Sequence, residues 1–104
     1  MSNQYKKGVL ELCVLSLLRQ HDSYGYDIAK NLSQHIDIAN GTVYQLLRKL
    51  MNTGLITSDF SEESSGHLRK YYSLTNKGCE AYQFQKQEWL TFVDTIDCLL
   101  QSKE

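Results

Sequence analysis

The sequence predicts a mainly α-helical fold with one small β-hairpin and a long C-terminal helix. Three observations lead to this prediction. Apolar residues recur at helical spacing through most of the chain, two stretches after residue 54 alternate like strands around a polar loop, and a heptad-like stripe follows Thr75. The chain has 104 residues, 41% of them hydrophobic, which is typical of a soluble globular protein with room for one ordinary domain.

Residues 7–20 are expected to form the first helix. Their apolar side chains are distributed nearly all round a helical wheel, which is typical of a helix buried on more than one side. In so small a protein, one side can face the core and the other a second subunit. The longest apolar run spans only about ten residues, too few to cross a membrane, and no signal-peptide cleavage site follows it. We therefore expect a cytoplasmic protein.

The next two helices are expected on either side of a short turn. Asp22 or Ser23 is suited to cap the earlier helix, which carries Tyr24, Ile28 and Leu32 at i, i+4, i+8 spacing. For the later helix we expect an N-cap at residue 40 and an end at residue 54, where a glycine favours the left-handed conformation. Its apolar residues follow the amphipathic pattern and are Val43, Leu46, Leu47, Leu50 and Met51.

A β-hairpin is expected next, with strands at Leu55–Phe60 and His67–Leu74. The residues between them, 61–66, have the composition of a mobile loop. Because successive side chains of a strand alternate between faces, Tyr72 and Leu74 should anchor the second strand to the core. Arg69 then lies on the opposite face, available to solvent or a partner.

The last helix is expected to be capped by Thr75 and to run to about Ser102. An apolar and aromatic stripe recurs along it at alternating steps of four and three. At 1.5 Å per residue the helix is about 40 Å long, and a core built from the first 74 residues cannot cover that length. The stripe therefore predicts a homodimer. Its members are Tyr82, Gln85, Trp89, Phe92, Ile96 and Leu99, widened by Val93 and Leu100.

The order of elements predicts a winged helix-turn-helix. Residues 1–74 are expected to form this DNA-binding domain, and residues 75–104 a C-terminal dimerisation helix. The outward side chains of the third helix suit base edges, because Arg pairs with guanine, Gln and Asn pair with adenine, and Thr contacts a thymine methyl or a phosphate. An ordinary solvated helix face is the alternative. The outward residues are Thr42, Gln45, Arg48, Lys49 and Asn52.

Two further cations, Arg69 and Lys70, lie in the hairpin beside its flexible loop. They are placed to reach phosphates or the minor groove, although a solubilising role on an edge strand explains them as well. Net charge does not indicate a nucleic-acid partner, because the formal charge of the chain is −1. Its distribution is uneven. Residues 40–78 hold five basic and three acidic side chains, whereas residues 79–104 hold two basic and five acidic ones.

Three stretches resemble the PadR family of bacterial regulators, in the same order and at similar spacing: YGYDIAKNL, NGTVYQLLRKLMNTGLI and GHLRKYYSLTNKG. The resemblance runs from about Val9 to about Leu100 and is to the compact subfamily with a single C-terminal helix. It implies a winged-helix repressor that dimerises through its first and last helices. It also implies that operator DNA is contacted by Tyr44, Arg48, Lys49, Arg69 and Lys70. Because a dimer would place two such helices about one turn of DNA apart, we expect the operator to be an inverted repeat.

The same resemblance suggests an effector site at the dimer centre. Some compact members of the family bind flat aromatic compounds between paired tryptophans, and an aromatic-walled cavity between subunits can stack a planar ligand. The alternative is that Trp89 only fills the interface. The residues expected at such a site come from the first and last helices and are Tyr5, Leu12, Leu15, Trp89, Phe92 and Val93.

No catalytic motif or metal-ligand spacing is found, so we expect neither an enzyme nor a cofactor. Cys13, Cys79 and Cys98 lie far apart without a CxxC motif. We expect them to be small hydrophobes of the core or of an interface, with a redox switch through Cys98 across a dimer axis as the alternative. The function expected is a sequence-specific DNA-binding transcriptional regulator, a repressor released by a small aromatic or hydrophobic effector. The alternative is a winged-helix protein-interaction module that binds no DNA.

Overall fold

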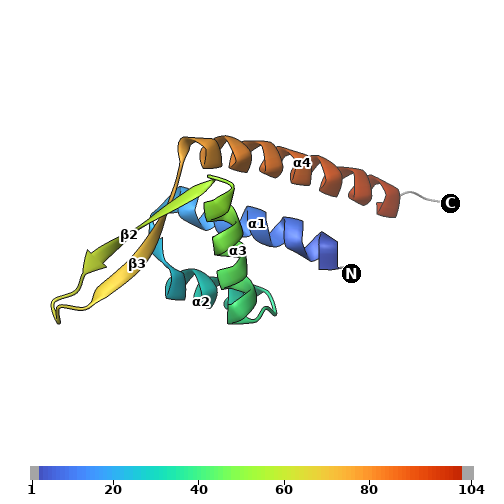
Figure 1. Cartoon of the computed structure of the whole chain (residues 1–104). Helices are drawn as coiled ribbons and strands as arrows, with labels where there is room; N and C mark the ends of the chain where they lie inside the picture. Colours follow the sequence, from blue (N-terminus) through green and yellow to red (C-terminus); the bar gives the residue numbers. More distant parts are fainter. Residues whose placement is uncertain (1–2, 102–104) are drawn as a thin grey trace.

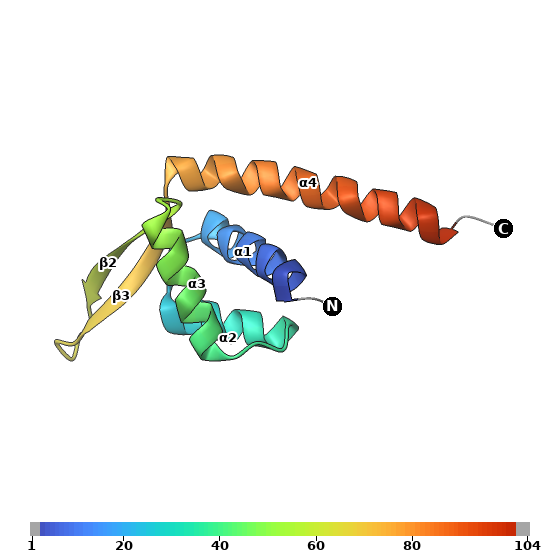
Figure 2. The same cartoon turned by 45° about the vertical axis from the view of Figure 1, so that its right-hand side comes forward.

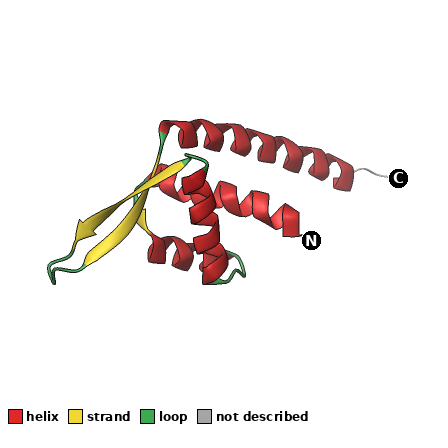
Figure 3. Ribbon diagram, viewed as in Figure 1, coloured by secondary structure: helices red, strands yellow, loops and turns green. Residues whose placement is uncertain are grey.

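The computed structural model describes the backbone of residues 3–101 and the side chains of residues 8–101. Over these residues it contains four helices and a three-stranded antiparallel sheet, whose hairpin projects to one side of the helices (Figures 1 and 3). The elements in chain order are α1 (Asn3–Gln20), β1 (Ser23–Tyr24), α2 (Gly25–His35), α3 (Asn40–Asn52), β2 (Ile56–Glu62), β3 (Leu68–Leu74) and α4 (Asn76–Gln101). The predicted winged helix-turn-helix with a long C-terminal helix is confirmed.

The core lies where α1, α2 and α3 meet the base of the sheet. The amphipathic spacing of α3 puts Val43, Leu47 and Leu50 on one face, and all three are fully buried. Tyr72 from β3 closes the core on the sheet side, as its place in the strand predicts. The remaining buried residues of this cluster are Val14, Leu15, Leu18, Ile28, Ala29, Leu32, Leu55 and Ile56.

The two ends of α3 differ in how well the sequence predicts them. Asn40 was expected as the N-cap, but the cap residue is Ala39, and no side chain caps the helix. The backbone N–H of Thr42 instead donates to the carbonyl of Ala39 at 3.0 Å. At the C-terminus the prediction is confirmed. Gly54 has a φ of 79°, and its N–H donates to the carbonyl of Met51, which is part of a Schellman motif.

The sheet contains a short strand that the sequence analysis missed. Ser23 and Tyr24 pair with Tyr72 and Tyr71 of β3, so the strand order is β1-β3-β2. The expected capping of α2 by Asp22 or Ser23 is therefore wrong, because the cap residue is Tyr24, and no side chain caps this helix either. The strand β2 also extends two residues beyond the predicted Phe60, since it continues to pair with β3 there.

The start of α4 is held against the turn between α3 and β2. Thr75 caps the helix as predicted, because its hydroxyl accepts a hydrogen bond from the N–H of Gly78 at 3.0 Å. The same hydroxyl donates to the carbonyl of Gly54 at 2.7 Å. Gly78 is buried, and a Cβ at this position would overlap the carbonyl oxygen of Leu55. A residue without a side chain therefore lets α4 approach the turn closely.

Beyond its first turn, α4 runs alongside α1 in the opposite direction and continues past its end (Figures 1 and 2). The protein is consequently elongated, with principal extents of 65 × 28 × 21 Å. Much of the apolar surface of α4 is not covered by its own chain, as the sequence analysis expected. The exposed apolar side chains of the helix are Phe84, Leu90, Phe92, Leu99 and Leu100. Neither this helix nor another among the described residues has the length and apolarity to span a membrane.

Candidate nucleic-acid interface

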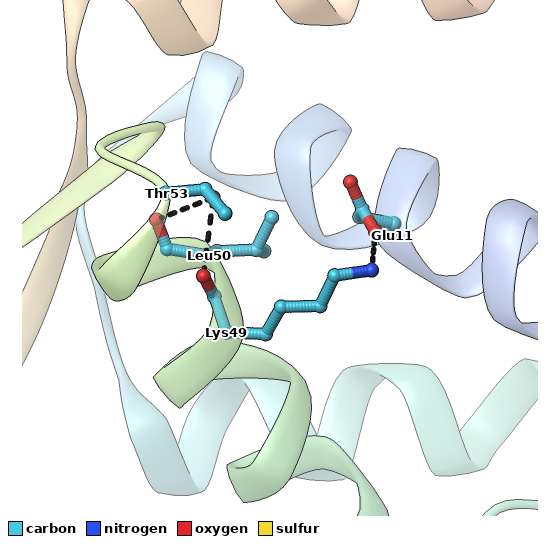
Figure 4. Close-up of polar contacts among 4 residues, drawn as sticks. All are labelled: Glu11, Lys49, Leu50 and Thr53. Carbon is cyan, nitrogen blue, oxygen red and sulfur yellow. Dashed lines mark hydrogen bonds and ion pairs between the residues drawn. The ribbon is translucent and has the colours of Figure 1, made fainter.

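The exposed face of α3 has two flanks that meet different parts of the protein. On one flank, Lys49 turns toward α1, and its Nζ lies 3.1 Å from Oε2 of Glu11 (Figure 4). Thr42 and Gln45 lie on the same flank, because together with Lys49 they line a small hollow of about 140 Å³ against Leu10 and Glu11. Three of the predicted DNA contacts are therefore placed on the α1 side of the helix.

On the other flank, Tyr44 and Arg48 face the start of α2 and the base of β3. The ring of Tyr44 packs over Gly25, since a Cβ on that glycine would come within 2.9 Å of its Cε1 atom. Gly25 therefore allows α3 to lie this close to α2 while Tyr44 stays 40% exposed. Burial raises the pKa of the Tyr72 hydroxyl, and the positive charge of Arg48 partly opposes that rise.

A hollow of about 270 Å³ lies between the start of α2, this flank of α3 and the wing. Lys70 contributes to it, with its Nζ 5.5 Å above the ring of Tyr72. The N-terminus of α2 opens here without a side-chain cap, and its backbone N–H groups favour an anion such as a phosphate. The hollow is lined by Tyr24, Gly25, Tyr26, Tyr44, Arg69, Lys70 and Tyr72.

The cations around this hollow differ in how far the protein already uses them. Between residues 8 and 101, neither Arg48 nor Lys70 forms an ion pair. Arg69, by contrast, stacks over the ring of Tyr24 at 3.9 Å, and its Nε lies 3.3 Å from Oε1 of Glu63. Tyr44 and Lys70 are thus exposed together at the hollow, and Arg48 is an exposed cation on α3, whereas Arg69 is engaged within the protein.

Sequence reasoning missed two exposed aromatic residues near this surface. Tyr26 in the first turn of α2 is 61% exposed and lines the hollow, and Phe60 on β2 is 57% exposed opposite Lys70. The sequence contains a signal for Tyr26, because Tyr24, Ile28 and Leu32 share one helix face at i, i+4, i+8 spacing and Tyr26 lies off that face. Asn52, the remaining predicted contact, is exposed at the C-terminal end of α3.

A second groove, of about 470 Å³, lies between α1 and α4. Three residues expected at the effector site, Leu12, Trp89 and Phe92, line it, and the two aromatic rings are 6.0 Å apart at a tilt of 41°. Leu15 does not, because it is fully buried in the core. Val93 is half-buried and does not line the groove, and the side chain of Tyr5 is outside the described residues.

The described residues contain no cluster of three or more His, Cys, Asp or Glu side chains suited to a metal ion. All three cysteines are free. Cys13 and Cys79 are half-buried and Cys98 is exposed, so a place for Cys98 at an interface stays a prediction.

Solved structures of several bacterial regulators have the same overall fold as this chain. A PadR-like regulator from Bacillus cereus is 36% identical and has a TM-score of 0.87, covering 97% of this chain and 100% of its own. A PadR family regulator from Clostridium difficile is 35% identical with a TM-score of 0.80, covering 88% and 97%. A Streptococcus transcriptional regulator is 33% identical with a TM-score of 0.86, covering 96% and 100%.

Residues 14–83 match the sequence model of the transcriptional regulator PadR-like family, which includes α2, α3 and the wing. Proteins of this family regulate transcription, bind DNA and typically dimerise, and they are generally not enzymes. Because the family model matches more than half of the chain and these solved regulators share its overall fold, the chain belongs to the PadR-like family of transcriptional regulators.

Proposed function

We propose that this protein is a homodimeric, sequence-specific repressor that reads an inverted-repeat operator. The observation that carries the proposal is the exposed flank of α3. Tyr44 lies there in the hollow that Lys70 of the wing and the N-terminus of α2 also line. Arg48 is near enough to Tyr72 for its charge to act on that hydroxyl, and within residues 8–101 neither Arg48 nor Lys70 forms an ion pair with a carboxylate. A recognition helix next to a site that favours phosphate is what a winged helix needs to dock in the major groove.

The residues take different parts in this proposal. Arg48 is the candidate for a bidentate contact with guanine, while Gln45 on the α1 flank and Asn52 at the C-terminal end of α3 are candidates for contacts with adenine. Tyr44 and Lys70 are placed for phosphate contacts on the wing side. Thr42 and Lys49 face α1, so we propose that they reach the backbone on the other side of the groove.

Dimerisation follows from the exposed apolar surface of α4. Leu99 and Leu100 are 67% and 77% exposed, and large apolar patches of this kind mark interfaces in soluble proteins. We propose that residues 75–104 are the dimerisation segment and residues 1–74 the DNA-binding domain. Two copies of α3 related by a twofold axis would read half-sites about 34–36 Å apart, one helical turn of DNA.

The test is a salt titration of duplex binding, followed by fluorescence anisotropy. Counterion release predicts a linear fall of log K with log salt, with a slope of about −0.9 for each phosphate contacted. Arg48→Ala should lower affinity by about 1–3 kcal/mol. Lys86→Ala on α4, outside the helix-turn-helix and the wing, is the charge-matched control and should leave affinity unchanged once sedimentation shows that the variant is still a dimer. Failure to bind any duplex at low salt would reject DNA binding and favour a protein-interaction module.

We also propose that the groove between α1 and α4 binds a planar aromatic effector, stacked against Trp89, and that the effector releases DNA. The support is that Leu12 of α1 and Trp89 and Phe92 of α4 line the groove, beside polar groups that could orient a ligand at Glu11, Gln85 and Glu88. Trp89 is the single tryptophan of the chain, so its fluorescence reports binding directly. The effector and the operator should weaken each other by the same factor, typically about 1–3 kcal/mol. Quenching without a change in operator affinity would leave a binding groove but no switch.

A further inference from the structure

Tyr24, the residue that precedes α2, is held by both strands of the wing. Its hydroxyl is 2.7 Å from Oγ of Ser61 on β2, and its ring meets that of Tyr71 edge to face, with centroids 6.5 Å apart. The guanidinium of Arg69 covers the ring at 3.9 Å. Tyr24 also pairs with Tyr71 through the backbone of β1. One side chain therefore connects the start of the helix-turn-helix with both strands of the hairpin.

Arg69 extends this connection toward the tip of the wing. Its Nε lies 3.3 Å from Oε1 of Glu63, the first residue after β2. The loop closes at this same residue, because the N–H of Glu63 donates to the carbonyl of His67, and the N–H of Gly66 donates to the carbonyl of Glu63, both at 2.8 Å. The guanidinium thus connects the ring of Tyr24, the platform on which it stacks, with Glu63, the residue whose backbone hydrogen bonds close the hairpin loop.

We propose that Arg69 is a positioning residue, which sets the angle of the wing against α2 through Tyr24 and Glu63 and makes no phosphate contact of its own. The proposal rests on the DNA-binding function and changes the role expected for Arg69 within it. A two-stranded hairpin is only marginally stable by itself, and β1 adds two residues to this sheet. The outer part of the wing projects away from the helices (Figures 1 and 3). Its orientation therefore depends on these side-chain contacts, and Lys70 is carried with it.

The distinguishing variant is Arg69→Lys. Lysine keeps the positive charge and can contact a phosphate, but it lacks the planar group that stacks on a ring and pairs with a carboxylate. A positioning role predicts that Arg69→Lys and Arg69→Ala weaken DNA binding alike, by about three- to tenfold, the range expected for loss of a stacked cation. The salt slope should stay that of the native protein. Lys70→Ala is the matched control and should lower the slope by about one contact.

Hydrogen exchange on the DNA-free protein, with the substitutions made singly and together, separates this proposal from the DNA-binding function. Hydrogen exchange of the β2 and β3 amides should accelerate in Arg69→Ala and in Tyr24→Leu, which removes the platform. Applying both substitutions should add little to either one, because they remove the same contact. Tyr24→Phe keeps the ring and should retain most of the protection.

Two results would overturn the positioning role in favour of a phosphate contact. One is an affinity for DNA in Arg69→Lys equal to that of the native protein. The other is a salt slope reduced by about one in Arg69→Ala while the exchange of the wing amides is unchanged. If the native protein bound no DNA, the proposed function would fail. The exchange data would still decide the proposal then, since protection of the wing amides that survives both substitutions would reject it.

Discussion

Replacing Gly78 with alanine tests how α4 is attached to the rest of the protein. Gly78 is buried in the first turn of α4, where a Cβ would overlap the carbonyl oxygen of Leu55 and come within 2.8 Å of Cδ1 of Leu74. The leucine side chain can move, but the carbonyl cannot move cheaply, because it accepts a hydrogen bond from the N–H of Thr75 at 3.1 Å. The helix must therefore shift away from the turn between α3 and β2.

Three contributions set the size of the effect. Overpacking at a close contact costs about 1–3 kcal/mol, and loss of the hydrogen bond to Leu55 adds about 1 kcal/mol. Alanine is favoured over glycine in a helix by about 1 kcal/mol, which offsets part of the cost. We therefore expect Gly78→Ala to lower the free energy of unfolding by about 1–3 kcal/mol. For a protein of this size each kcal/mol lowers the Tm by about 4–8 °C.

Gly41→Ala is the matched control. Gly41 lies in the first turn of α3, and a Cβ there would have no heavy atom within 4 Å, so alanine should be neutral or stabilising by up to about 1 kcal/mol. Both variants are compared by thermal unfolding at one protein concentration, since dimerisation makes the Tm depend on concentration. If Gly78→Ala were as stable as the native protein, the close seating of α4 on the Leu55 carbonyl would be refuted.

Three more substitutions or reactions test other parts of the structure. Gly25→Ala should displace the ring of Tyr44 and weaken duplex binding while changing the Tm little, because that exposed ring can swing outward. Unchanged affinity in anisotropy would contradict the close packing of Tyr44 on Gly25. Glu11→Gln should lower the free energy of unfolding in urea by less than about 1 kcal/mol, because the side chain of its partner Lys49 is 60% exposed. A larger loss would mean that the Glu11–Lys49 ion pair is buried in the dimer. Burial raises the pKa of the Cys13 thiol, so less of it is thiolate at pH 8, and single-cysteine variants should alkylate more slowly at Cys13 than at the exposed Cys98; equal rates would contradict this.

The sequence by itself determined most of the fold, because the signals involved are local. The i, i+3, i+4, i+7 spacing of Val43, Leu46, Leu47 and Leu50 is a property of one helix and predicts its buried face without knowledge of its neighbours. Gly54 ends α3 and Thr75 caps α4 through contacts within a few residues. The strand β1 escaped prediction for the opposite reason. Two residues have no periodicity, and their pairing partners lie far along the chain.

The same division explains how much of the candidate site could be predicted. Periodicity identified the exposed residues of α3, but it treats Arg48 and Lys49 as equivalent neighbours. Only packing separates them, because α1 brings Glu11 to one flank while β3 brings Lys70 to the other. The role of Arg69 likewise depends on Tyr24, which reaches it through the sheet. Helical spacing is set by the backbone of each segment, whereas the partner of an exposed side chain is set by whichever distant segment the core packs beside it.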